Sequence, residues 1–112
     1  MNITAQTSSQ VTTLYLEGNF VYTERKVFQE AIRKACEEGS RRIVIDLAEV
    51  VCLDSAALGL LMVTHRQLCN EHRRLALARP RANVKQIIQL ANLLEMIPMS
   101  DSGELSPTQK SA

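Results

Sequence analysis

The chain opens with two short runs of strand-forming residues, which a few polar positions separate. Residues 2–8 and 11–17 are rich in β-branched and aromatic side chains, and a polar turn separates them. Such runs favour strands, so the pattern predicts a β-hairpin. A helical spacing follows, with Thr23 as N-cap and a stop at Gly39. The inward positions expected for this helix are Val27, Phe28, Ala31, Ile32 and Ala35.

Further elements are indicated in the rest of the chain. Residues 42–47, RIVIDL, form a continuous apolar run that is typical of a central strand covered on both faces. The pattern then predicts a helix over residues 55–70, a short buried strand over residues 75–78 and a third helix over residues 83–94. A last strand is expected in residues 95–99, EMIPM. The inward positions expected for the third helix are Val84, Ile87, Ile88 and Ala91.

The order β-β-α-β-α-β-α-β alternates after its opening hairpin. It predicts an α/β fold with a mixed sheet and helices packed against it. At 112 residues the chain fits one domain, which we place at residues 1–99. Residues 100–112 are polar, contain Gly and Pro and have almost no apolar anchor, so we expect them to form a disordered tail.

Composition narrows the class of protein. No apolar run approaches the roughly 18 residues that span a bilayer, and the first residues lack the basic-then-apolar pattern of a signal peptide. Three cysteines without a CxxC pair argue against a disulfide framework or a zinc knuckle and leave reduced thiols as the default. We therefore expect a cytoplasmic protein without membrane insertion, either a monomer or a weak dimer.

Charge is balanced over the whole chain but not locally. The net charge is +1, which gives no overall attraction to nucleic acid or anionic lipid. One third of the chain nevertheless contains several basic residues and a single acidic residue, Glu71. A nucleic-acid footprint has this composition, but aromatic residues are not interleaved, so an acidic protein partner is favoured over direct nucleic-acid binding. The basic residues are Arg66, Arg73, Arg74, Arg79, Arg81 and Lys85.

The pair Asp54-Ser55 stands where the central strand gives way to the second helix. A serine there lies at the first turn of the helix, where backbone N–H groups lack partners and the dipole is positive. A plain N-cap is one explanation, since Asp and Ser are both preferred caps. A phosphorylation site is the other, because a helix N-terminus favours a phosphate.

The two faces of the second helix separate the alternatives. Projected at helical spacing, one arc forms the core face: Leu58, Leu61, Met62, His65, Leu68 and Cys69. The residues outside this arc are small and apolar near the start of the helix, although solvated helix faces are normally charged. Such a patch beside a serine suggests a docking surface that phosphorylation of Ser55 would block. Besides Ser55, its residues are Ala56, Gly59, Leu60 and Val63.

The segment VIDLAEVVCLDSAALGLLM resembles the signature of STAS domains of the anti-sigma factor antagonist type. In that signature a strand ends in Asp-Leu, and a short loop, Asp-Ser, two small residues, Leu-Gly and an apolar run follow. LYLEGNF is similar to the family's second strand and its glycine, and NVKQIIQLANLLEMIPM to its late helix and strand. Two features depart from the family. Ala56-Ala57 replace a common Ser-Gly or Thr-Gly, and the segment after Met99 is unsuited to a closing helix.

The resemblance implies a non-catalytic switch protein. Its unmodified form would bind an anti-sigma factor, with Ser55 as phospho-acceptor and Asp54 as the supporting residue of the motif. A serine kinase, often the anti-sigma factor itself, would phosphorylate Ser55, and a PP2C-type phosphatase would reverse this. The alternative is a small cytoplasmic STAS subunit of a lipid-transport ABC assembly.

The remaining candidate chemistry is weak. A Ser-His-Asp hydrolase needs its histidine within hydrogen-bond reach of the serine, but His65 lies ten residues along the same predicted helix and His72 farther still. His65, Cys69 and His72 have a spacing that could gather metal ligands, yet core packing explains them as well and a fourth ligand is not evident. We predict no enzyme activity, no metal site and no bound cofactor.

Overall fold

Strands and helices alternate along the chain after an opening hairpin. A computed structural model describes residues 1–100. Two 3₁₀ turns, η1 (Tyr22–Glu24) and η2 (Leu93–Glu95), precede the first helix and follow the last. The strands are β1 (Asn2–Ser8), β2 (Val11–Phe20), β3 (Arg42–Leu53) and β4 (Arg74–Ala78), and the helices are α1 (Arg25–Glu37), α2 (Ser55–Asn70) and α3 (Ala82–Leu90).

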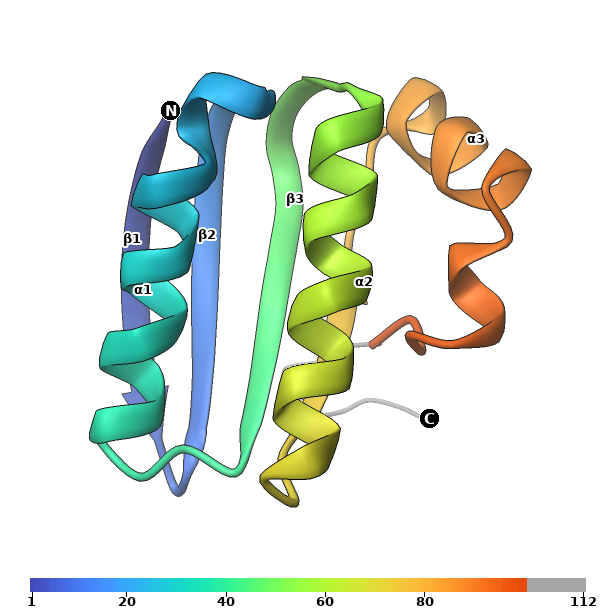
Figure 1. Cartoon of the computed structure of the whole chain (residues 1–112). Coiled ribbons are helices and arrows are strands. Elements are labelled where there is room, and N and C mark those ends of the chain that lie inside the picture. Colours follow the sequence, from blue (N-terminus) through green and yellow to red (C-terminus); the bar gives the residue numbers. More distant parts are fainter. Residues whose placement is uncertain (101–112) are drawn as a thin grey trace.

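The strands form one four-stranded mixed sheet in the order β1-β2-β3-β4. β1 pairs antiparallel with β2, whereas β2, β3 and β4 run parallel. Helices α1 and α2 lie over the same face of the sheet, and α3 lies on the side of α2 away from α1 (Figure 1). The predicted α/β fold with a mixed sheet is therefore confirmed.

The opening hairpin turns through Ser9 and Gln10. Both residues have positive φ angles, 51° and 69°, which is the conformation of a type I′ turn. This turn matches the twist of the flanking strands, so Ser8 pairs directly with Val11. The polar turn of the sequence thus lies where the pattern predicted it.

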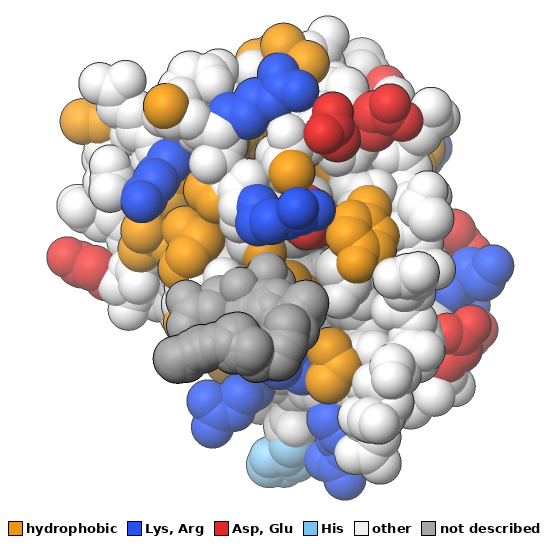
Figure 2. Space-filling model, turned by 180° about the vertical axis from the view of Figure 1, so that it is seen from behind, with side chains coloured by type: hydrophobic (Ala, Val, Ile, Leu, Met, Phe, Trp, Pro, Cys, Tyr) orange, Lys and Arg blue, Asp and Glu red, His pale blue; other side chains and the backbone are white. Residues whose placement is uncertain are grey.

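Strand β3 is buried on both of its faces, as its apolar run indicated. Residues 43–47 are all buried. Ile43 and Ile45 belong to the main core with side chains of α1 and α2, while Val44 belongs to a smaller cluster on the opposite face with Ala76 and Ala78 of β4. Viewed from that opposite side, the molecule mixes apolar, basic and acidic side chains at its surface (Figure 2).

The start of α1 differs from the sequence prediction. Thr23 lies inside η1 and is not the N-cap; Glu24 occupies that position without a side-chain cap bond. Val27, expected to face inward, is 44% exposed. Val27 lines an open groove between α1 and β1, together with Ile3. β1 is an edge strand, so the sheet does not extend past it to cover Val27. Phe28, Ile32 and Ala35 are buried as predicted.

The end of the described chain also departs from the prediction. Helix α3 stops at Leu90, because Asn92 adopts a left-handed conformation, and Ala91 is exposed instead of inward. The expected last strand is reduced to one isolated parallel bridge between Met99 and Leu77. Pro98 lacks an N–H group to extend the ladder, although its carbonyl accepts the Leu77 N–H at 3.0 Å.

The predicted tail begins at a residue that the structure places. Ser100 donates its backbone N–H to the Leu77 carbonyl at 2.6 Å. The rest of that tail, residues 101–112, lies outside the described residues. Within residues 1–100, every helix is too short or too polar to cross a bilayer.

Candidate functional site

The site is built where β3 passes into α2. Asp54 has an extended backbone and is the N-cap of α2. One carboxylate oxygen, Oδ1, accepts the backbone N–H of Ala57 at 2.9 Å, and the other, Oδ2, accepts the backbone N–H of Tyr22 at 3.0 Å. The hydrogen bond from Ala57, followed by that from Tyr22, holds the pKa of the Asp54 carboxyl below its usual range. Asp54 therefore caps α2 and ties it to η1.

Ser55 is the first residue of α2 and is exposed. Since Asp54 supplies the cap, the Ser55 hydroxyl is not needed for that purpose. Within residues 1–100 this hydroxyl makes no intramolecular hydrogen bond. The plain N-cap explanation thus applies to the aspartate of the pair, and the serine presents a free hydroxyl at the positive end of a helix of 16 residues.

The core face of α2 is rotated slightly from the predicted arc. Leu61 and Leu68 are buried as expected, but Cys69 is exposed, and Leu58, Met62 and His65 are only half-buried. The remaining buried positions are Ala57 and Thr64. An arc drawn from large apolar residues misses these two, because their small side chains are the ones that fit where a helix packs close to the sheet.

The outer face of α2 carries the predicted patch. Gly59 and Val63 are exposed, while Ala56 and Leu60 are half-buried. These four residues line a groove of about 270 Å³ with a further residue of α2 and with residues from the segment that includes η1 and α1. The additional lining residues are Val21, Tyr22, Arg25, Gln29 and Ala57.

Arg25, which lines this groove, is held against the ring of Tyr22, another lining residue. The centre of its guanidinium group lies 4.0 Å from the centroid of the Tyr22 ring, within the range of a cation–π interaction. Its Nη1 also donates to the Tyr22 carbonyl at 3.2 Å. Asp54 fixes the backbone of Tyr22, and Tyr22 in turn places Arg25. No periodic signal in the sequence links these residues, because more than thirty positions separate Tyr22 from the Asp54 bond that holds it.

The two histidines lie away from Ser55: His65 is farther along α2, and His72 follows the end of that helix. His65, Cys69 and His72 line a second groove of about 430 Å³ at the opposite end of the helix from Ser55. The sulfur of Cys69 lies 3.7 and 3.9 Å from the two ring nitrogens of His65. Within residues 1–100, no three histidine, cysteine or acidic side chains are arranged to hold a metal ion.

The exposed Ser55 thus lies at the start of α2, directly after the parallel strand β3 and beside a mostly apolar groove. The chain belongs to the STAS family: residues 2–110 match the model of the STAS domain. A STAS-domain containing protein of Pseudomonas aeruginosa is 29% identical over 102 residues, which cover 89% of this chain and 100% of that protein. BtrV of Bordetella bronchiseptica, a candidate anti-sigma factor antagonist, is 26% identical over 68 residues, 61% of this chain and 59% of that protein.

Solved structures share the fold. The anti-sigma factor antagonist SpoIIAA of Bacillus, in its unphosphorylated form, superposes with a TM-score of 0.76 at 18% identity, over 92% of this chain and 91% of that chain. The phosphorylated form of SpoIIAA gives a TM-score of 0.69 at 17% identity, over 92% and 95% of the two chains. The predicted resemblance to STAS domains of anti-sigma factor antagonists is thus confirmed at the level of family and fold.

Proposed function

We propose that this chain is an anti-sigma factor antagonist. In its unmodified form it binds an anti-sigma factor and so releases a sigma factor. Membership of the STAS family supports this role, as does the likeness of fold to SpoIIAA over nearly the whole of both chains. In this role the chain is a binding protein of the cytoplasm and not an enzyme.

Phosphorylation of Ser55 is the proposed switch. The observation that carries it is the exposed hydroxyl at the first residue of α2, next to Ala56 in the apolar groove. A phosphate there adds nearly two negative charges to the docking surface at neutral pH. The dipole at the start of α2 favours an anion, so the fold tolerates the phosphate while the partner is repelled.

The chemistry of the switch belongs to the partners. A serine kinase, which in this proposal is the anti-sigma factor, binds ATP and transfers the terminal phosphoryl group of ATP to the Ser55 oxygen. ADP leaves, and the Ser55 proton passes to a base on the kinase. A PP2C-type phosphatase hydrolyses the phosphoserine and restores binding. Both oxygens of Asp54 accept backbone N–H groups, so we assign Asp54 a positioning role at the phosphosite. Ala56, Gly59, Leu60 and Val63 are the proposed partner-binding residues.

The test is capture of partners from the native cells, followed by mass spectrometry of the captured proteins and of the chain itself. Wild-type protein and Ser55→Ala should both retain an anti-sigma factor, while Ser55→Asp should lose it. Phosphopeptide mapping should place the phosphate on Ser55. Capture by Ser55→Asp equal to that by wild type would contradict the switch.

A matched control adds the same charge elsewhere. Ser8 is exposed at the end of β1, at the opposite end of the sheet from Asp54, because β1 is antiparallel to β2 and β2 is parallel to β3. Ser8→Asp should therefore capture the anti-sigma factor as wild type does. Stable co-purification with a transport ATPase, without phosphoserine, would instead identify the chain as a STAS subunit of a lipid-transport ABC assembly.

A further inference from the structure

We infer that the groove between η1, α1 and α2 receives an apolar side chain of the anti-sigma factor together with an acidic side chain that pairs with Arg25. This inference rests on the proposed function and specifies the chemistry of the partner. The groove is smaller than the pockets of roughly 300–1,000 Å³ that enclose small molecules, which favours one or two side chains of a protein as its occupant.

The charge that lines the groove is positive only. Among the described residues that line it, Arg25 alone is charged, and the walls are mostly apolar: Val21, Ala56, Ala57, Leu60 and Val63. A ligand that fills this groove places its apolar part against these walls and meets a single cation, Arg25. A carboxylate is the protein group that complements an arginine there, since the pair forms charge-assisted hydrogen bonds.

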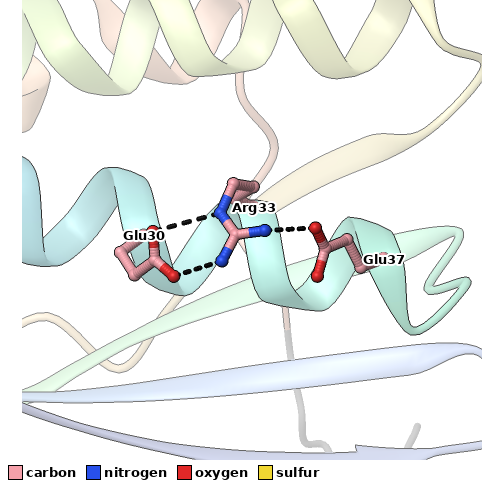
Figure 3. Close-up of polar contacts among 3 residues, drawn as sticks. All are labelled: Glu30, Arg33 and Glu37. Carbon is pink, nitrogen blue, oxygen red and sulfur yellow. Dashed lines mark hydrogen bonds and ion pairs between the residues drawn. The ribbon is translucent and has the colours of Figure 1, made fainter.

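Arg25 lacks an acidic partner among the residues that the structure describes. In residues 1–100, it takes part in none of the ion pairs, although other arginines do. Arg33 of the same helix is the clearest contrast, because Glu30 and Glu37 hold its guanidinium group from both sides (Figure 3). The Arg25 guanidinium instead rests on the Tyr22 ring and one carbonyl, which leaves donors for an external carboxylate.

The carboxylates of Asp54 and Glu24 do not compete for Arg25, and Glu24 pairs with the amino terminus of Met1 at 3.1 Å. Asp54 is close in space, since its Oδ2 contacts the backbone N–H of Tyr22. However, its two oxygens are engaged by Tyr22 and Ala57, and the start of α2 offsets its charge. The same contact holds Tyr22 and therefore Arg25 in position before binding, which lowers the ordering cost of association.

The test uses the purified anti-sigma factor identified by capture and calorimetric titration at low and high salt. Arg25→Gln should weaken binding about tenfold, and Arg25→Glu about a hundredfold, because a buried charge pair in an interface has coupling of this order. The salt dependence of binding should fall in both variants. Arg33→Gln is the matched control: its side chain is already paired within α1, so affinity should not change.

A second pair of variants separates the charge of the partner from the packing of Arg25. Val63 is 53% exposed at the edge of the groove, so a long charged side chain fits there without burial. An acidic partner predicts that Val63→Glu weakens binding at least tenfold more than Val63→Lys. Equal losses for these two variants, or unchanged affinity of Arg25→Glu, would overturn the inference while the proposed function stands. Failure of the wild-type chain to bind any anti-sigma factor would instead contradict the proposed function.

Discussion

The Asp54 carboxylate joins two elements by accepting the backbone N–H of Tyr22 at 3.0 Å while it caps α2 through Ala57. The first contact reaches across more than thirty residues, and the second is local. One side chain thus fixes the start of the helix that carries Ser55 and the turn that carries Tyr22. The geometry of the groove depends on this relationship, which gives the first prediction.

Replacement of Asp54 by alanine should loosen both elements together. The loss of a cap lowers the melting temperature by roughly 5 °C in a domain of this size. Amide hydrogen exchange should accelerate at Tyr22 and at Ala57, the two donors to the missing carboxylate. Exchange that changes at Ala57 alone would show that the link to η1 is absent in solution. Thr23→Ala is the control, because Thr23 is exposed within η1 and caps no helix.

The lowered pKa of Asp54 gives a prediction about pH. A group whose pKa is lower in the folded state stabilises the fold above its unfolded pKa, near 4, and loses this contribution as the pH falls through its folded pKa. The melting temperatures of wild type and Asp54→Asn should therefore differ by a constant amount above about pH 5 and converge at lower pH.

Thermal unfolding of both proteins between neutral and acidic pH measures this convergence. Glu30 also has a lowered pKa, caused by its hydrogen bond with Arg33, but it titrates equally in both proteins and its effect cancels. A difference that widens as the pH falls would have the wrong sign for a stabilising carboxylate and would contradict the assignment.

The sequence pattern was sufficient for most of the fold. β3 and α2 were predicted correctly, because a continuous apolar run and a helical spacing of apolar residues both indicate which side chains are buried. Thr23, Ala91 and the last strand were misjudged for local reasons: η1 displaces the start of α1, Asn92 turns the chain after α3, and Pro98 limits the last pairing to a bridge. The spacing of apolar residues along the chain does not indicate such turns and bridges.

Half of the candidate site could be predicted from the sequence. The outer face of α2, with Ser55 and Val63, follows from helical geometry once the helix is located. The other wall of the groove, with Tyr22 and Arg25, arises from the packing of α1 beside α2 and from the bond between Asp54 and the Tyr22 N–H. Such a tertiary contact leaves no trace in the spacing of residues along one chain.

A third prediction concerns the ion pair between Arg79 and Asp46. The Arg79 Nε lies 2.8 Å from the Asp46 Oδ2, and the Asp46 side chain is only 6% exposed. Arg79→Ala leaves this buried carboxylate with the Ala48 N–H as its hydrogen-bond donor, at 3.0 Å. The free energy of unfolding should fall by about 2 kcal/mol, less than for a fully buried pair because solvent reaches Arg79.

Urea denaturation measures this loss. The matched control is Arg81→Ala, since the pair of Arg81 with Glu49 is exposed and should be worth less than about 1 kcal/mol. Adding Asp46→Asn to Arg79→Ala should recover part of the stability by removing the unpaired charge. If the double variant is less stable than Arg79→Ala, the pair is not the source of the loss.

The last prediction follows from Gly59, which lies inside α2 on its exposed face. A Cβ atom added there meets nothing within 4 Å, so packing within the described residues does not require a glycine. Glycine inside a helix costs roughly 0.5–1 kcal/mol relative to alanine. This cost is explained if the partner backbone approaches α2 closely at this position, as the proposed docking surface requires.

Gly59→Ala should therefore raise the free energy of unfolding by roughly 0.5–1 kcal/mol. It should also weaken binding of the anti-sigma factor about tenfold, because an added methyl group in a well-packed interface causes a steric clash. Chemical denaturation and calorimetric titration measure the two effects. Gln67→Ala, exposed on the same helix but outside the groove, should leave binding unchanged. A more stable Gly59→Ala that binds as tightly as wild type would show that the partner does not approach this face of α2 closely.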